Sequence, residues 1–158
     1  MKPVTAKELK EELNSRSPND LRELCLRLAR FKKENKELLT YLLFEASDEQ
    51  EYIEGVKEEI DEQFKMVNRK SYYLIKKSVS KILRNTRKYI RYSKKKRTEV
   101  ELLIYFCKKL KGLYPSIQKR TGLINLYDRQ IENIIKNISM LHEDLRGDYD
   151  SDLEELIG

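Results

Sequence analysis

Residues 65–97 contain fourteen lysines and arginines and no aspartate or glutamate. Within this stretch apolar residues recur at intervals of three and four, which is the spacing that places side chains on one face of an α-helix. The residues with this spacing are Ile75, Val79, Ile82, Leu83, Tyr89 and Ile90. We therefore predict one long helix over about residues 70–93, with an apolar side in a core and a cationic side towards solvent.

We call the cationic side of this predicted helix the basic face. It consists of Lys77, Lys81, Arg84, Lys88 and Arg91, and Lys70 and Lys95 extend the row. Such a row can bind the carboxylates of an acidic protein, or it can neutralise phosphates and release their counterions. Tyr73 and Tyr92 lie close to the row, where their rings can stack on bases. The sequence favours an acidic protein as the partner of this face, and nucleic acid is the alternative.

Two acidic segments support a third interpretation, in which the basic face is paired within the protein or is simply solvated. Residues 48–62 hold eight acidic residues and one lysine, and residues 143–155 hold seven acidic residues and one arginine. Either segment can neutralise part of the positive charge if the fold places it beside residues 65–97. Which cations stay free therefore depends on how the acidic segments pack.

The rest of the chain also has helical periodicity, with few glycines and prolines to interrupt it. Five glycines and three prolines in 158 residues are few turn signals for a β-sandwich, and 38% charged residues suit helices with a hydrated outer side. The spacing of Thr5 and Glu8, and Ser17 before Pro18, mark helix starts. We predict an all-α fold of six or seven antiparallel helices. They span about residues 6–14, 18–33, 34–46, 48–67, 70–93, 98–112 and 123–145.

We expect these helices to form a single domain over residues 1–147, followed by an acidic, solvated tail over residues 148–158. Residues 37–41 and residues 101–105 have similar sequences, an echo of five residues that suggests an internal repeat. Each copy of this short sequence follows a basic turn. A true repeat would make two three-helix units, resembling a short HEAT-like α-solenoid. A chance echo leaves a compact helical bundle. In either arrangement the third helix should turn four leucines to the core, namely Leu38, Leu39, Leu42 and Leu43.

Few residues of the chain are suited to catalysis. His142 is the only histidine, and the sequence shows no orienting partner for it as a general base. Cys25 and Cys107 lie in apolar runs without a Cys-x-x-Cys spacing, so we expect both to be buried free thiols. The five glycines are scattered and form no phosphate-binding loop. We expect a protein that is not an enzyme and holds no cofactor.

One acidic motif in the C-terminal segment has the spacing of metal ligands. Asp148, Asp150 and Asp152 alternate as the first ligands of an EF-hand calcium loop do. Leu153 stands where that loop needs glycine for its sharp turn, and the chain as given ends at Gly158, before the position of the bidentate glutamate. The motif therefore predicts a solvated acidic segment and no metal site.

The N-terminal third contains Leu9-Lys10-x-x-Leu13 and then Ser17-x-x-Asp20-Leu21, ahead of a lysine-rich centre. In these residues it resembles a family of short bacterial all-helical proteins of uncharacterised function. The resemblance implies a bacterial cytoplasmic protein and no particular activity or site. The N-terminus has no secretory signal pattern, and no apolar stretch approaches the ~18 residues that span a bilayer. We expect a cytoplasmic protein that does not bind membranes.

Overall fold

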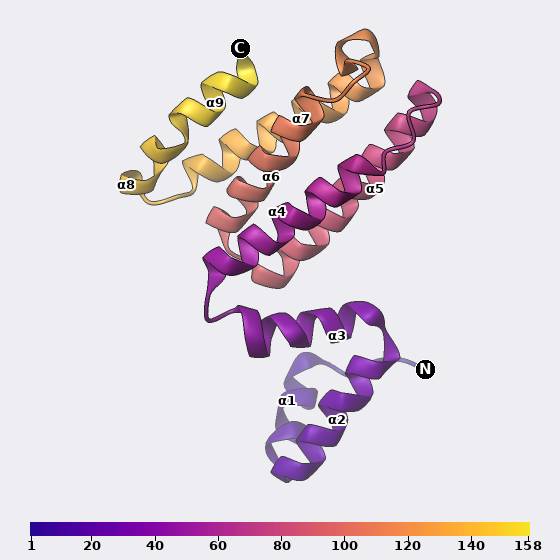
Figure 1. The fold of residues 1–158 in the computed structure, drawn as a ribbon. Helices are drawn as coiled ribbons and strands as arrows, with labels where there is room; N and C mark the ends of the chain where they lie inside the picture. Colours follow the sequence, from indigo (N-terminus) through magenta and orange to yellow (C-terminus); the bar gives the residue numbers. More distant parts are fainter. The chain divides into compact units, whose positions relative to one another are not determined.

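The computed structural model describes residues 1–158, and it contains helices and turns but no β-strand (Figure 1). This confirms the predicted all-α class. The chain divides into two compact units, residues 1–44 and residues 45–158. The single domain that we predicted over residues 1–147 is therefore wrong in its boundaries, because residues 1–44 cluster by themselves and residues 148–158 belong to the second unit.

The N-terminal unit contains α1 (Ala6–Asn14), α2 (Pro18–Phe31) and α3 (Lys33–Thr40), and a π-helical turn follows at Tyr41–Glu45. The predicted capping residues start the first two helices. Thr5 accepts a hydrogen bond from the Glu8 backbone and donates one to the Glu8 carboxylate, which completes a capping box. The Ser17 hydroxyl caps α2, with a proline in its first turn.

The apolar sides of these three helices are not buried. We predicted a core position for Leu42 and Leu43 and a buried thiol for Cys25, and the structure shows all three exposed. Leu38 is also exposed, and Leu39 is only half-buried. Tyr41 is the only buried residue of the unit. Helical spacing identifies the apolar side of a helix correctly here, but three short helices are too few to enclose a core.

The C-terminal unit is built around α6 (Lys96–Lys111), which contacts α4 (Glu49–Lys65), α5 (Tyr72–Ser93) and α7 (Thr121–Ser139). The apolar residues of α6 with no exposed surface are Val100, Leu102, Leu103, Phe106, Cys107 and Leu110. Consecutive helices run antiparallel, as the short connections predicted (Figure 1). The Phe64 and Phe106 ring centroids lie 5.7 Å apart, which joins α4 to α6 in the core.

The alternation of helix direction brings two connections to one end of the unit. Residues 66–71 link α4 to α5, and residues 112–120 link α6 to α7. The Tyr72 hydroxyl donates a hydrogen bond to the Ser116 carbonyl at 3.3 Å, across these two connections. We call this end of the C-terminal unit the shared end.

The acidic C-terminal segment is helical and packed, so our prediction of a solvated tail is wrong. After α7 ends at Ser139, six residues before the predicted end, α8 (Glu143–Arg146) and α9 (Asp150–Ile157) follow. Tyr149 and Leu156 are buried, and α9 contacts α6. The Tyr127 hydroxyl donates to the Leu156 carbonyl at 2.8 Å. The burial of Tyr149 and Leu156 thus holds this segment against the rest of the unit, although the segment is rich in acidic residues.

The predicted repeat is not confirmed. The two copies of the echo lie at the end of α3 and within α6, and their environments differ. Leu102 and Leu103 have no exposed surface, whereas Leu38 is exposed. A HEAT-like array would place equivalent residues in equivalent environments.

The packing of α9 yields a testable prediction from two adjacent residues. Leu156 is 2% exposed and Ile157 is 65% exposed. Replacing Leu156 by alanine should lower the free energy of unfolding by about 2 kcal/mol or more, since it leaves a cavity under α9. Ile157→Ala is the control and should change that free energy by less than about 0.5 kcal/mol. Urea unfolding followed by circular dichroism measures both, and equal effects would contradict the docking of α9.

Candidate functional site

The basic face lies on the outer side of α5, as predicted. Ser71 caps the helix, and its inner side buries Ile75, Val79, Ile82 and Ile90. Because these residues fix the rotation of the helix, the opposite side points to solvent. The exposed residues of the basic face are Lys77, Lys81, Arg84 and Arg91, and Lys88 is half-buried.

Four of the five cations of the basic face form no ion pair. They are Lys77, Lys81, Arg84 and Arg91. Lys88 differs, because its Nζ lies 4.8 Å from the centroid of the Tyr89 ring. No acidic residue occurs between residues 65 and 97, so the neighbours one helical turn away carry no negative charge.

The acidic segments that we considered as internal partners pair with other cations. On α4, Glu49 lies 3.4 Å from the Lys95 Nζ, and Asp61 lies 2.7 Å from the Lys109 Nζ. On α9, Asp152 and Glu155 each lie 2.7 Å from the Lys108 Nζ. Glu49 thus pairs at the end of the cationic row, and the other carboxylates pair with cations of α6. Neither acidic segment forms an ion pair with Lys77, Lys81, Arg84 or Arg91.

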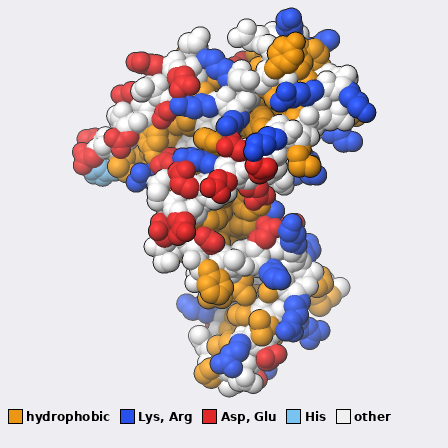
Figure 2. Space-filling view, in the orientation of Figure 1, with side chains coloured by type: hydrophobic (Ala, Val, Ile, Leu, Met, Phe, Trp, Pro, Cys, Tyr) orange, Lys and Arg blue, Asp and Glu red, His pale blue; other side chains and the backbone are white.

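Charge is unevenly distributed over the C-terminal unit. Figure 2 shows Lys and Arg side chains gathered at the shared end, where the connections of α4 to α5 and of α6 to α7 lie. Asp and Glu side chains gather over the start of α4 and over α8 and α9. This separation gives the unit one end that attracts anions.

The two predicted tyrosines differ in accessibility. Tyr73 is 74% exposed at the start of α5, where its ring is free to stack on a ligand. Tyr92 is half-buried near the end of α5, and its ring lies edge-on to Tyr89 at 6.0 Å. The two lie nineteen residues apart on one helix, which is roughly 28 Å along its axis. The structure therefore does not bring them into one site.

A cationic hollow at the shared end was not foreseen from the sequence. Tyr73 and Lys76 from α5, together with Arg120 and Gly122 at the start of α7, line a hollow of about 430 Å³. The Arg120 guanidinium lies 4.6 Å from the centroid of the Tyr72 ring. These residues come from segments more than forty positions apart, and only the antiparallel packing of the helices brings them together. The adjacent cations Lys119 and Arg120 were the one available signal.

A second cationic hollow lies at the other end of α5, with a volume of about 370 Å³. Arg91 of the basic face lines it together with Arg87, Lys94, Lys96 and Glu99. Glu99 lies 3.4 Å from the Lys96 Nζ, and Arg87 donates a hydrogen bond to Gln130 of α7. The basic face therefore runs between two cationic hollows over the length of α5, which is about 33 Å.

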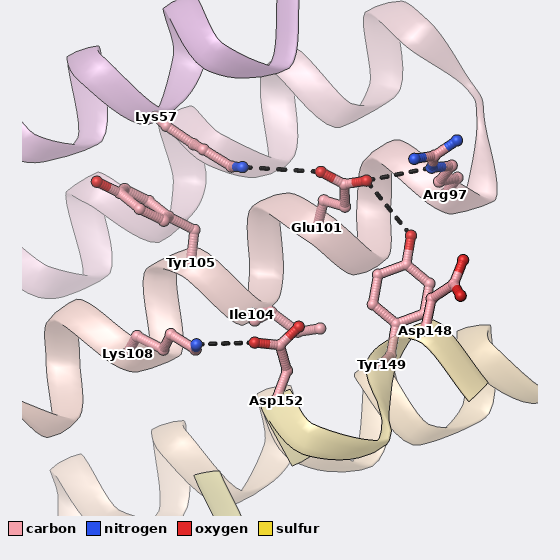
Figure 3. Close-up of a pocket in the computed structure, with 9 residues that line it drawn as sticks. All are labelled: Lys57, Arg97, Glu101, Ile104, Tyr105, Lys108, Asp148, Tyr149 and Asp152. Carbon is pink, nitrogen blue, oxygen red and sulfur yellow. Dashed lines mark hydrogen bonds and ion pairs between the residues drawn. The ribbon is translucent and has the colours of Figure 1, made fainter. Parts of the chain in front are cut away.

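A third hollow, of about 330 Å³, lies among α4, α6 and α9, and its charges are mostly paired with one another (Figure 3). Glu101 accepts a hydrogen bond from Arg97 at 3.1 Å and from the Tyr149 hydroxyl at 3.4 Å, and the Lys57 Nζ lies 3.7 Å from its other oxygen. Asp152 pairs with Lys108 across the same hollow. This network attaches the C-terminal helices to α6.

Residues that we weighed for catalysis are not brought together. Cys107 is buried in α6, and burial raises the pKa of its thiol to about 12, although the charge of Arg87 acts in the opposite sense. His142 is exposed, and its Nδ1 accepts a hydrogen bond from the Asp144 backbone as the cap of α8. Cys25 belongs to the other unit. Cys107 therefore remains a protonated core residue at neutral pH.

No group of three or more histidine, cysteine, aspartate or glutamate side chains is arranged to hold a metal ion. Asp150 and Asp152 lie in the first turn of α9, and Asp152 is paired with Lys108. No helix combines the length and the apolar composition that crossing a membrane requires.

No protein-family model matches this sequence, and neither the curated proteins nor the solved structures yield a significant match. The resemblance of the N-terminal third to short bacterial helical proteins therefore stays a prediction.

The buried thiol gives a prediction about reactivity. In a Cys25→Ser variant Cys107 is the only thiol. Its alkylation near pH 8 should be roughly a thousandfold slower in the native protein than in denaturant, because both burial and the raised pKa suppress the thiolate. Mass spectrometry of the alkylated chain measures both rates. Rapid labelling of the native protein would show that α6 is not enclosed as described.

Asp61 gives a prediction about acid stability. Burial raises the pKa of Asp61, but hydrogen bonds from Lys109 and Tyr105 outweigh it, so the pKa is lowered overall. A lowered folded-state pKa stabilises the protein above the ordinary carboxyl pKa of about 4, and this contribution is lost as the pH falls. Asp61→Asn should therefore reduce the loss of unfolding free energy between about pH 6 and pH 3.

The control for this experiment is Glu58→Gln, since Glu58 is an exposed carboxylate on the same helix that forms no ion pair. Urea unfolding at both pH values gives the difference for each variant. If the two substitutions change the pH dependence equally, the contacts of Asp61 do not contribute to acid sensitivity.

Proposed function

We propose that this protein is a non-enzymatic binding module whose basic face holds the phosphates of a nucleic acid strand. One observation carries the proposal, namely that Lys77, Lys81, Arg84 and Arg91 are exposed along one helix and have no acidic partner. Each such cation can release condensed counterions when it neutralises a phosphate, which is the main sequence-independent term in nucleic-acid binding. Cytoplasmic action is part of the proposal, since both cysteines are free.

The composition of the surface favours phosphates over an acidic protein. Between residues 74 and 96 no large apolar side chain is exposed. Specific protein interfaces are usually centred on buried aromatic or aliphatic anchors, and lysine is depleted from them. A surface made of lysine and arginine without such an anchor is better suited to a highly charged strand. Tyr73, at the shared end, adds a ring on which a base can stack.

The geometry of α5 also suits an extended polyanion. The five cations of the basic face follow one another at steps of three or four residues, or about 5 to 6 Å along the helix axis. With its two end hollows the face extends about 33 Å, close to the ~34 Å of one turn of B-form DNA. A strand lying along α5 would meet cations over its whole contact length.

We expect intact protein to bind labelled oligonucleotides with an affinity that falls log-linearly with salt, as measured by fluorescence anisotropy. Replacing Lys77, Arg84 and Arg91 together by glutamine removes three phosphate contacts. The slope of log affinity against log salt should then become shallower by about 2 for single strands and about 3 for duplexes. Tyr73→Leu should weaken the binding of single strands more than the binding of duplexes, because only unpaired bases are free to stack on the ring.

The matched control removes three exposed cations from the N-terminal unit, Lys2, Arg16 and Lys33, again as glutamines. It lowers the net charge equally, so an equal loss of binding would show that net charge, not the basic face, is responsible. A polyglutamate peptide is the competitor for the alternative partner. If polyglutamate binds and oligonucleotides do not, the face serves an acidic protein and the proposal is wrong.

A further inference from the structure

The N-terminal unit has amphipathic helices but no core of its own. None of the side chains of α1, α2 or α3 is buried. Leu28 is 62% exposed and Phe31 is 78% exposed, although both lie on the apolar side of α2. The large apolar side chains exposed on or just after these helices are Leu9, Leu13, Leu24, Leu26, Leu28, Phe31, Leu38, Leu42, Leu43 and Phe44.

A unit of this size needs an additional source of stability. It spans residues 1–44, and units of about 40 residues usually depend on disulfides, metal ions or association. Its only cysteine is Cys25, a free thiol, and the structure contains no cluster of metal ligands. Association is the remaining source, and the exposed apolar residues are the surface for it.

The packing of α2 against α3 creates a concave apolar surface. α2 and α3 pack against each other, and the Asn35 side-chain amide donates to the Leu28 carbonyl at 2.7 Å. Cys25, Leu28, Asn35, Leu38, Leu39 and Leu42 line a groove of about 230 Å³ between them. We call this the α2–α3 groove. An apolar helix ridge is the shape that such a groove accommodates.

The same unit also carries a matching ridge. Leu9 and Leu13 lie one turn apart on α1, and both are exposed. A helix of nine residues is not stable alone in water, even with the capping box that Thr5 and Glu8 provide. Burial of the α1 ridge would supply the missing stabilisation.

We infer that a second copy of this chain occupies the α2–α3 groove, with the α1 ridge of each copy seated in the groove of the other. Groove and ridge on one unit satisfy the requirement of a two-fold interface that both partners present the same surface. The ridge and the groove together hold five large apolar side chains that are exposed in the single chain, and the reciprocal arrangement would bury them in both copies. They are Leu9, Leu13, Leu28, Leu38 and Leu42.

Charge is compatible with this arrangement. α1 carries three acidic and two basic residues, whereas residues 18–40 carry six basic and four acidic residues. The helix that carries the ridge and the segment that forms the groove therefore have net charges of opposite sign, which favours their approach in both halves of a two-fold dimer. The basic face is on the other unit and takes no part in this interface.

Sedimentation velocity of the full chain over a range of micromolar concentrations should show a monomer–dimer equilibrium. Leu9→Gln combined with Leu13→Gln should raise the dimer dissociation constant at least about 100-fold, because four apolar contacts are lost per dimer. The control is Ile135→Gln combined with Ile157→Gln, which replaces two exposed aliphatic residues of the other unit and should leave that constant unchanged. Circular dichroism checks that the control keeps its helices and that any loss of helix in the Leu9 and Leu13 double variant does not exceed the nine residues of α1.

Cys25 provides a second measurement, because it lines the groove and the other thiol is buried. Alkylation of Cys25 should slow as the protein concentration rises, and this dependence should vanish in the Leu9 and Leu13 double variant. A wild-type chain that stays monomeric throughout would overturn the inference. Slow alkylation at concentrations where sedimentation shows only monomer would also overturn it, since the groove would then be covered without a second copy. Species larger than a dimer would exclude the reciprocal two-fold arrangement.

Discussion

Burial of α6 is the interaction on which the C-terminal unit depends. This helix has apolar residues around most of its circumference, and α4, α5, α7 and α9 cover it. Because α5 gives its apolar side to this core, its rotation is fixed and its cations must face outward. The basic face is thus a direct consequence of hydrophobic packing, and the rigid core beneath it holds the cations in a row.

The absence of acidic residues on α5 then determines which charges stay free. A lysine on the surface of a helix can pair with a carboxylate one turn away, but residues 65–97 provide none. The acidic residues of α4 and α9 pair with cations of α6 and of the chain around it, such as Lys109 and Lys108. Four cations of the basic face are left to water, where mutual repulsion favours any polyanion that neutralises them.

The sequence predicted local structure well and burial poorly, for physical reasons that particular residues show. Capping chemistry is local, so Thr5 and Ser17 placed helix starts correctly. Periodicity tells which side of a helix is apolar but not what covers it, so Leu42 was expected in a core and Leu156 was not. The hollow between Tyr73 and Arg120 depends on tertiary packing, which no local pattern contains.

The two exposed surfaces of this chain respond to salt in opposite ways. Contacts between the basic face and phosphates weaken as salt rises, because each counterion released on binding gains less entropy when the surrounding salt concentration is higher. Association through leucines and phenylalanines is insensitive to moderate salt and is strengthened by strongly hydrated ions. The proposed dimer would therefore persist under conditions that release nucleic acid. Because the apolar groove and the basic face belong to different units, the proposed self-association and the proposed binding of a strand use separate surfaces.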